Sequence, residues 1–372
     1  MTNNNSIFNI QSEIINDYKS YVKSFIQIKN DNIREVVDTE IDSGKLWPEA
    51  LIRFNPSFEQ DETVEELVSQ NILHPELSNV FTGYNSLYKH QVDALRLGTN
   101  NKDFIVTSGT GSGKSLTFIG TIFDYLFKTD TGGKPGIKAI MVYPMNALIN
   151  SQTEELNGYR DNYEKSTGKP FPIKYAQYTG QEKQDEREKI REELPDIILT
   201  NYMMLELILT RIQEKSIRDF IYNSLQFLVF DELHTYRGRQ GSDVALLIRR
   251  IKAKSNNIIT CIGTSATMIS GGTLKEQKEK VAEVATTLFG SIFTGQQIVN
   301  ESLDRSFGTH GEIPTKAEIA ASIKTEINKQ GAENELNDFP LAVWLENRIA
   351  LDEKEGILVR NKPITFTKIA EI

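Results

Sequence analysis

The sequence is short of two things, cysteine and long apolar runs. Cys261 is the single cysteine among 372 residues, so no disulfide can form within the chain. No apolar stretch approaches the roughly 20 residues that a membrane-spanning helix needs. The polar start, Met1 to Asn5, lacks the charged and apolar regions of a signal peptide. These absences argue against a disulfide-stabilised secreted domain, and we expect a cytoplasmic protein with no membrane partner.

An excess of basic charge is also missing. The chain has 42 Lys and Arg against 51 Asp and Glu, a formal net charge of −9. This balance argues against binding nucleic acid through bulk positive charge, as histones do. A local basic surface is still compatible with it, because six basic residues and one acidic residue lie between Arg237 and Lys254. That run suits either a solvated helix face or a face that contacts phosphates.

What the sequence does have is a glycine-rich stretch, SGTGSGKS, at residues 108–115. It follows the apolar run 104–106 and precedes an amphipathic segment, 116–127, so a strand, a tight loop and a helix are expected in succession. This is the context of a phosphate-binding loop, whose backbone N–H groups and helix N-terminus face the phosphates of a nucleotide. The residues expected to bind it are Thr110, Gly111, Ser112, Gly113, Lys114 and Ser115, with Lys114 on the β- and γ-phosphates and Ser115 on Mg²⁺.

Upstream of this loop, Tyr88 and Gln91 are candidates for binding the adenine base. An amide group both donates and accepts hydrogen bonds, so Gln91 suits the edge of adenine. Tyr88 could stack on the base. A glutamine on the surface with no ligand is the alternative.

An acidic pair follows a second apolar run. Residues 227–230 lead directly into Asp231 and Glu232, which places two carboxylates where ligands bind in open α/β sheets. We expect Asp231 to hold Mg²⁺ and Glu232 to orient and deprotonate the attacking water. Capping of a turn is the alternative. The hydroxyl-rich stretch 264–267 could hydrogen-bond this pair or form a simple Ser/Thr turn.

Apolar runs and helical patterns alternate along the middle of the chain. Strands are expected at 137–143, 173–178, 197–200, 227–230 and 258–262, with helices between them that include one long helix over 203–222. Regular alternation predicts a parallel sheet with right-handed crossovers.

Four motifs occur in the order found in one enzyme family: Gln91, the phosphate loop, Asp231–His234 and Ser265–Thr267. With them the chain resembles a superfamily 2 helicase of the DExH type. The resemblance implies a RecA-like P-loop NTPase domain, an α/β three-layer sandwich with a parallel sheet, and hydrolysis of ATP with Mg²⁺. The roles it implies are catalysis by Lys114, Asp231, Glu232 and His234, and coupling by Ser265 and Thr267.

The same resemblance places the nucleic-acid contacts on loops after three other strands. The stretches that carry it are YPMNAL, YTG and LTN, which start at residues 143, 178 and 199. Such loops bind phosphates through backbone N–H groups and short polar side chains, without reading base sequence. Ordinary helix caps are the alternative reading. The residues expected to contact nucleic acid are Pro144, Asn146, Thr179, Gly180, Thr200 and Asn201.

We expect three parts: an N-terminal accessory helical region (1–80), the ATP-binding domain (81–290) and a mostly helical C-terminal extension (291–372). The extension reads as truncated, because no candidate for the family's second RecA-like domain follows Met268. That domain supplies an arginine finger in the family, so the prediction is ATP binding with little hydrolysis by this chain alone.

The stretches DELHTYRGRQG, YPMNAL and SGTGSGKS look like those of large bacterial DNA helicases of the repair and anti-phage-defence type. On this resemblance we expect the ATP-binding motor half of a helicase or translocase that acts on DNA rather than RNA. A second motor lobe or the subunits of a repair or defence complex are the further partners it implies. The alternative is a module that binds ATP and nucleic acid, within a defence or restriction complex, without translocating.

Overall fold

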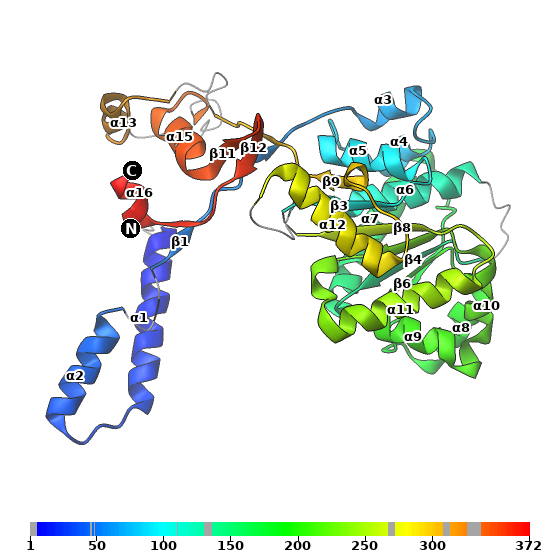
Figure 1. Ribbon diagram of the computed structural model, residues 1–372, viewed down its shortest axis with the longest axis horizontal. Coiled ribbons are helices and arrows are strands. Elements are labelled where there is room, and N and C mark those ends of the chain that lie inside the picture. The colour runs from blue at the N-terminus through cyan, green and yellow to red at the C-terminus, as the bar shows by residue number, and fades with distance from the viewer. Residues whose placement is uncertain are drawn as a thin grey trace. The chain divides into compact units, whose positions relative to one another are not determined.

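The computed structural model describes residues 6–44, 47, 49–109, 111–129, 136–266, 272–307, 313–325 and 336–372 (Figure 1). Contacts within the chain divide it into two units. One comprises Ser57–Asp304, and the other joins Met1–Pro56 to Arg305–Ile372. Each unit is described separately below.

The larger unit is built on a parallel sheet of seven strands in the order β5-β6-β4-β7-β8-β3-β9. Its strands β3, β4 and β7 consist of buried residues throughout, as expected for a sheet covered on both faces. The short edge strand β9 was not expected from the sequence. The strands are β3 (Phe104–Thr107), β4 (Ala139–Tyr143), β5 (Tyr175–Gln177), β6 (Ile197–Asn201), β7 (Phe227–Phe230), β8 (Thr260–Ser265) and β9 (Ile298–Asn300).

Helices cover both faces of this sheet. Successive residues of a strand point to opposite faces, so Phe104 and Val106 pack in one apolar cluster and Ile105 in another. The first cluster holds side chains of α5, α6 and α7, and the second holds side chains of α9 to α12. The predicted three-layer α/β sandwich with a parallel sheet is confirmed. The helices are α3 (Val64–Ser69), α4 (Leu77–Val80), α5 (Lys89–Gly98), α6 (Lys114–Lys128), α7 (Asn146–Thr167), α8 (Gln184–Glu193), α9 (Tyr202–Thr210), α10 (Lys215–Ser224), α11 (Gly238–Lys254) and α12 (Leu274–Phe289).

The single long helix expected over 203–222 is wrong. Helix α9 ends at Thr210, a short 3-10 turn (Ile212–Glu214) follows, and α10 begins at Lys215. Glu214 is buried in this turn, where its carboxylate accepts a hydrogen bond from the Tyr178 hydroxyl at 2.6 Å and lies 3.6 Å from Arg191. A buried carboxylate is costly unless it is paired, so these partners fix the position of the break. The break leaves Arg211 at the end of α9.

The smaller unit is mostly helical, with short strand pairs. A strand near its start, β1 (Leu51–Ile52), pairs with β13 (Ile364–Thr365) near its end, and β11 (Leu351–Lys354) forms a hairpin with β12 (Ile357–Arg360). The helices of this unit are α1 (Ile7–Phe25), α2 (Asp31–Asp42), α13 (Lys316–Ser322), α15 (Pro340–Leu345) and α16 (Phe366–Glu371).

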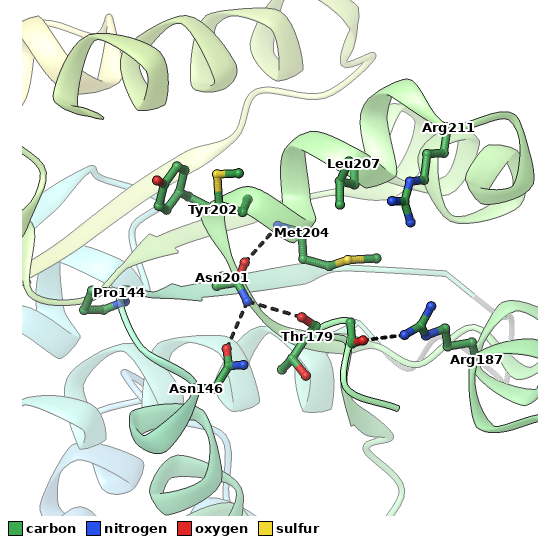
Figure 2. Close-up of a pocket in the computed structure, with 11 residues that line it drawn as sticks. Pro144, Asn146, Thr179, Arg187, Asn201, Tyr202, Met204, Leu207 and Arg211 are labelled. Atoms are coloured by element: carbon green, nitrogen blue, oxygen red, sulfur yellow. Dashed lines mark hydrogen bonds between the residues drawn. The ribbon is translucent and has the colours of Figure 1, made fainter. Parts of the chain in front are cut away.

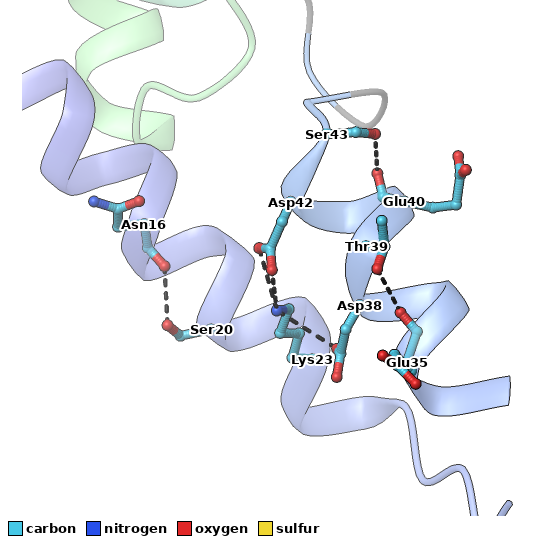
Figure 3. A network of polar contacts seen from close by, with 9 residues as sticks. All are labelled: Asn16, Ser20, Lys23, Glu35, Asp38, Thr39, Glu40, Asp42 and Ser43. Carbon is cyan, nitrogen blue, oxygen red and sulfur yellow. Dashed lines mark hydrogen bonds and ion pairs between the residues drawn. The ribbon is translucent and has the colours of Figure 1, made fainter. Parts of the chain in front are cut away.

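A polar contact joins α1 to α2 (Figure 3). Lys23 Nζ lies 3.1 Å from an Asp42 carboxylate oxygen and 3.5 Å from Asp38. No residue of α1 is buried. Exposed ion pairs stabilise a protein by less than about 1 kcal/mol. Because α1 buries no residue, this helix pair also has little of the apolar burial that holds the sheet unit together. Within the described ranges, no helix is long and apolar enough to cross a membrane.

Candidate functional site

The glycine-rich loop connects β3 to α6 and depends on two glycines. Gly111 and Gly113 have φ of +78° and +66°, which side chains rarely tolerate. At Gly113, which caps α6, an added Cβ would lie 2.5 Å from Gln91 Nε2. Both positions therefore require glycine, as a phosphate-binding loop does. The predicted nucleotide residue Thr110 lies outside the described residues.

Several polar groups of this loop already have partners within the protein. Lys114 Nζ donates to the carbonyl oxygens of Ser108 and Gly109 at 3.1 and 3.2 Å. The backbone N–H of Gly109 donates to Glu301 Oε2 at 2.8 Å, and the hydroxyls of Ser108 and Ser112 are 2.6 Å apart. A bound phosphate would have to replace these contacts. Glu301 follows β9, nearly two hundred residues from the loop, and no motif in the sequence signals it.

Gln91 lies beneath the loop and is 3% exposed, so the surface-glutamine alternative is wrong. Its Oε1 accepts from the Tyr88 N–H at 2.9 Å and its Nε2 donates to the Gly113 carbonyl at 3.0 Å. The amide therefore ties α5 to the loop. Tyr88 packs against the rings of Phe58 and His90, with centroids 5.0 and 5.7 Å away. Contact of Gln91 and Tyr88 with adenine remains a prediction.

His90 supports the same loop from below. It is fully buried, and its Nε2 lies 2.9 Å from the Ser112 carbonyl oxygen. Burial lowers the pKa of His90, while the hydrogen bond to Ser112 opposes this shift. A neutral ring with its proton on Nε2 fits both observations, since a carbonyl oxygen can only accept.

The acidic pair lies at the carboxyl end of β7, beside β8. The Thr264 hydroxyl donates to Asp231 Oδ1 and accepts from the Glu232 N–H at 3.2 Å, so one hydroxyl connects both acidic residues. Burial raises the pKa of Asp231, and the Thr264 hydrogen bond and the Lys114 charge act against that shift. Glu232 has φ of +53°, a strained conformation that is often found at functional sites.

A histidine joins the acidic pair to β8. His234 Nδ1 lies 3.1 Å from Glu232 Oε2 and 3.3 Å from Ser265 Oγ. Glu232 Oε2 is itself buried without an aligned hydrogen bond in the described part of the chain. The structure thus brings together Glu232, His234 and Ser265. The expectation that the stretch 264–267 hydrogen-bonds the acidic pair is confirmed at Thr264, and Thr267 lies outside the described residues.

The residues around Asp231 fit a magnesium ion that arrives with a nucleotide. Mg²⁺ is usually held by one or two carboxylates, with substrate phosphates and water completing its shell. Among the described residues, no three His, Cys, Asp or Glu side chains gather to hold a metal alone. One half-buried carboxylate, Asp231, with the half-buried Ser115 at the start of α6, matches that donor set.

A pocket of about 480 Å³ opens at the carboxyl ends of β4 and β6 (Figure 2). It brings together five of the six residues predicted to contact nucleic acid. The sixth, Thr200, is buried, and its hydroxyl donates to the Tyr178 carbonyl at 2.6 Å. The lining residues are Pro144, Asn146, Thr179, Gly180, Arg187, Asn201, Tyr202, Met203, Met204, Leu207 and Arg211.

Asn201 connects the segments of this pocket (Figure 2). Its amide nitrogen donates to Asn146 Oδ1 at 2.9 Å and to the Thr179 carbonyl at 3.4 Å. Its Oδ1 accepts from the Met204 N–H at 2.8 Å, which caps α9. The helix-cap alternative is therefore correct for Asn201 and does not conflict with a place in the pocket wall.

Two arginines line the pocket that the sequence did not single out. Arg187 extends from α8 and donates to the Gly180 carbonyl, and its Nε is buried without a partner among described residues. Arg211, at the end of α9, is exposed, and its guanidinium makes no hydrogen bond or ion pair with any residue that the structure describes. Neither arginine gave a sequence signal for a binding site. Arg187 lies in a charged helix, and Arg211 lies within the single long helix that was expected.

Three of the six basic residues between Arg237 and Lys254 make contacts within the protein. On α11, Arg249 donates to the carbonyls of Thr287 and Leu288 at 2.8 and 3.4 Å, and Lys252 donates to that of Phe289 at 3.2 Å. Arg250 forms an ion pair with Glu206. For these three residues, the contacts favour packing against neighbouring helices over binding of phosphates.

Comparison with known proteins agrees with this geometry. The DEAD/DEAH box helicase family matches residues 88–274, half of the chain. An uncharacterised ATP-dependent helicase of Methanocaldococcus jannaschii is 32% identical over 200 residues, which cover 52% of this chain and 27% of that protein. The Druantia protein DruE of Escherichia coli is 23% identical over 442 residues, covering 88% and 24%.

Among solved structures, the DUF1998 helicase MrfA bound to DNA covers 71% of this chain and 33% of that one, with a TM-score of 0.53 and 23% identity. This likeness agrees with the RecA-like fold predicted from the sequence. The chain spans about a quarter of the length of the two relatives named above. The predicted resemblance is confirmed, and the chain belongs to the DEAD/DEAH box helicase family.

Proposed function

We propose that this chain binds Mg·ATP at the loop of residues 108–115 and a nucleic-acid strand in the pocket around Asn201, as the ATP-hydrolysing motor part of a DNA helicase or translocase. The observation that carries the proposal is the position of the acidic pair. The pair follows β7, which lies between β4 and β8 in the sheet. The end of β4 forms part of the pocket, and β8 is the neighbour of β3, which the phosphate loop follows. The residues proposed for the three sites thus follow strands at the same edge of the sheet.

In this proposal the nucleotide displaces Lys114 from the loop carbonyls, and the ammonium group then binds the phosphates. Bound Mg²⁺, held through Asp231 and Ser115, would neutralise charge on those phosphates. Glu232 orients the attacking water and accepts its proton, a role for which its carboxylate must be ionised. His234 and Ser265 keep that carboxylate in place.

The pocket supports nucleic-acid binding through both its charge and its wall. Arg187 and Arg211 supply positive charge on a chain that is acidic overall, which gives the local attraction that phosphates need. Met203, at 57% exposed, and Leu207 offer apolar surface beside them. The Asp231 N–H donates to the Val142 carbonyl at 2.9 Å, two residues before Pro144, so the acidic pair and the pocket are linked through adjacent backbone.

Binding of a fluorescent ATP analogue and of labelled oligonucleotides tests this function. We expect analogue binding that needs Mg²⁺ and that Lys114→Ala weakens on the order of 100-fold, since a charge-assisted contact to phosphates is lost. Single-stranded DNA should bind in the micromolar range or tighter at low salt and be compared with RNA of the same sequence. Analogue binding that is unchanged in Lys114→Ala would contradict the nucleotide site, and tighter binding of RNA would contradict the choice of DNA.

A further inference from the structure

One side of the pocket is a turn whose backbone donors are already occupied by an anion. The N–H of Thr179 and that of Gly180 each donate to the Glu182 carboxylate at 2.8 Å. The Thr179 hydroxyl donates to the same group at 2.6 Å. Three donors that converge on one carboxylate form an anion-binding concavity of the kind that also receives phosphate.

The turn has the shape that such a site requires. Gly180 has φ of +90°, which directs two successive N–H groups to one side. Arg187 fixes the turn from the other side by donating to the Gly180 carbonyl, and no ion pair joins Arg187 to Glu182 among the described residues. The donors are therefore held in place by groups other than Glu182 and would persist if its carboxylate moved away.

A carboxylate and a phosphate cannot share these donors. Both present two oxygens and a negative charge, and like charges placed next to each other are strongly unfavourable. Glu182 is half-buried, while the two arginines of the pocket carry the opposite charge and attract the strand. A strand that enters the pocket therefore meets attraction from the arginines and competition at the turn.

We propose that the Glu182 carboxylate competes with a phosphodiester of the nucleic-acid strand for the N–H groups of Thr179 and Gly180. This competition sets the affinity of the pocket for the strand. This inference rests on the proposed function of the pocket. A backbone phosphate takes the N–H groups of Thr179 and Gly180, and the Glu182 side chain turns out into solvent. In the alternative role, Glu182 is a brace that shapes the turn for the strand. A neutral side chain at this position would then weaken binding of the strand instead of tightening it.

The test is binding of a fluorescent single-stranded DNA to Glu182→Gln, with Glu188→Gln as the matched control. Glu188 is exposed on the adjacent helix α8, so the control changes net charge equally without touching the turn. We expect about tenfold tighter binding by Glu182→Gln, discounted for solvent screening. The control should differ from the unmodified chain by less than about twofold, because a screened surface charge contributes little.

Equal or weaker binding by Glu182→Gln would overturn the proposal and favour the brace. If the unmodified chain and both variants fail to bind DNA, the proposed function of the pocket fails, and a second measurement decides on Glu182. Amide NMR shifts of Thr179 and Gly180 are followed as inorganic phosphate is added. A larger response in Glu182→Gln than in the unmodified chain supports competition, and equal responses overturn it.

Discussion

The phosphate loop and the pocket around Asn201 are the two proposed anion-binding regions on one sheet edge, and their positive charges are held differently. The loop is a single stretch of sequence, and its cation, Lys114, is folded onto the loop's own carbonyls. The pocket is assembled from separate segments, and one of its cations, Arg211, is exposed without a partner among described residues. The nucleotide site must rearrange to bind, whereas the pocket already presents charge.

The two regions also share a feature: in each, backbone N–H groups donate to the carboxylate of a glutamate. Glu301 accepts from Gly109 in the loop, and Glu182 accepts from Thr179 and Gly180 in the pocket. The comparison suggests that N–H donors left by tight glycine turns are satisfied internally until a phosphate replaces the carboxylate. Substitutions that affect one region and not the other can break this comparison.

The largest effect is expected from Gly113→Ala. A left-handed residue other than glycine costs roughly 1–2 kcal/mol, and the new Cβ would lie 2.5 Å from Gln91 Nε2. This clash would break the hydrogen bond from Gln91 Nε2 to the Gly113 carbonyl. ATP affinity should then fall on the order of 100-fold, measured by fluorescence titration. Gly158→Ala on α7 is the control, because nothing lies within 4 Å of its added Cβ. Equal loss in both variants would show that the loop conformation is not what binds the nucleotide.

A smaller effect, on the pocket alone, is expected from Arg211→Gln. Loss of one phosphate contact should weaken binding of single-stranded DNA by up to about tenfold at low salt and reduce the slope of log affinity against log salt by about 0.7. Lys215→Gln, an exposed change nearby on α10, serves as the control. An unchanged slope in Arg211→Gln would mean that this guanidinium does not contact the strand.

A modest gain is expected from Glu301→Gln. Removing the negative charge next to Gly109 should tighten ATP binding by a few-fold, because the phosphates no longer face a carboxylate. Titration of the same fluorescent analogue measures this change. Weaker binding would indicate that Glu301 shapes the loop, and the parallel between the two regions would then fail.

The smallest effect concerns stability and pH, without a direct change in binding. Burial lowers the pKa of His90 from its ordinary value of 6.5, so below that pH the unfolded chain binds a proton that the folded chain does not. Stability should therefore fall as the pH drops from about 6.5 toward the folded pKa, by at most about 1.4 kcal/mol per unit.

Urea unfolding at pH 7.5 and 5.5 measures this dependence, with His90→Gln as the variant that lacks the titrating group. The unmodified chain should lose more stability than the variant between the two values. An identical loss would show that His90 is not the group responsible.

The motifs of the proposed nucleotide site are easier to recognise in the sequence than the full lining of the pocket, for a physical reason. A phosphate loop and an acidic pair after a strand are local patterns, and the parallel sheet then follows from the alternation of apolar runs and helical patterns. Arg211 was hidden because a buried glutamate, Glu214, interrupts an apparently continuous helix. Glu301 and Glu182 were hidden because their contacts depend on how a turn or a distant segment folds back. The roles of the site residues remain predictions.

The most direct test of the account measures both ligands on the same two variants. Lys114→Ala and Arg211→Gln are each titrated with the fluorescent ATP analogue and with labelled single-stranded DNA. We expect Lys114→Ala to bind the analogue on the order of 100-fold more weakly with unchanged affinity for DNA. Arg211→Gln should bind DNA up to about tenfold more weakly with unchanged affinity for the analogue. Loss of both ligands in either variant, with the fold intact by circular dichroism, would contradict two separate anion sites on one sheet edge.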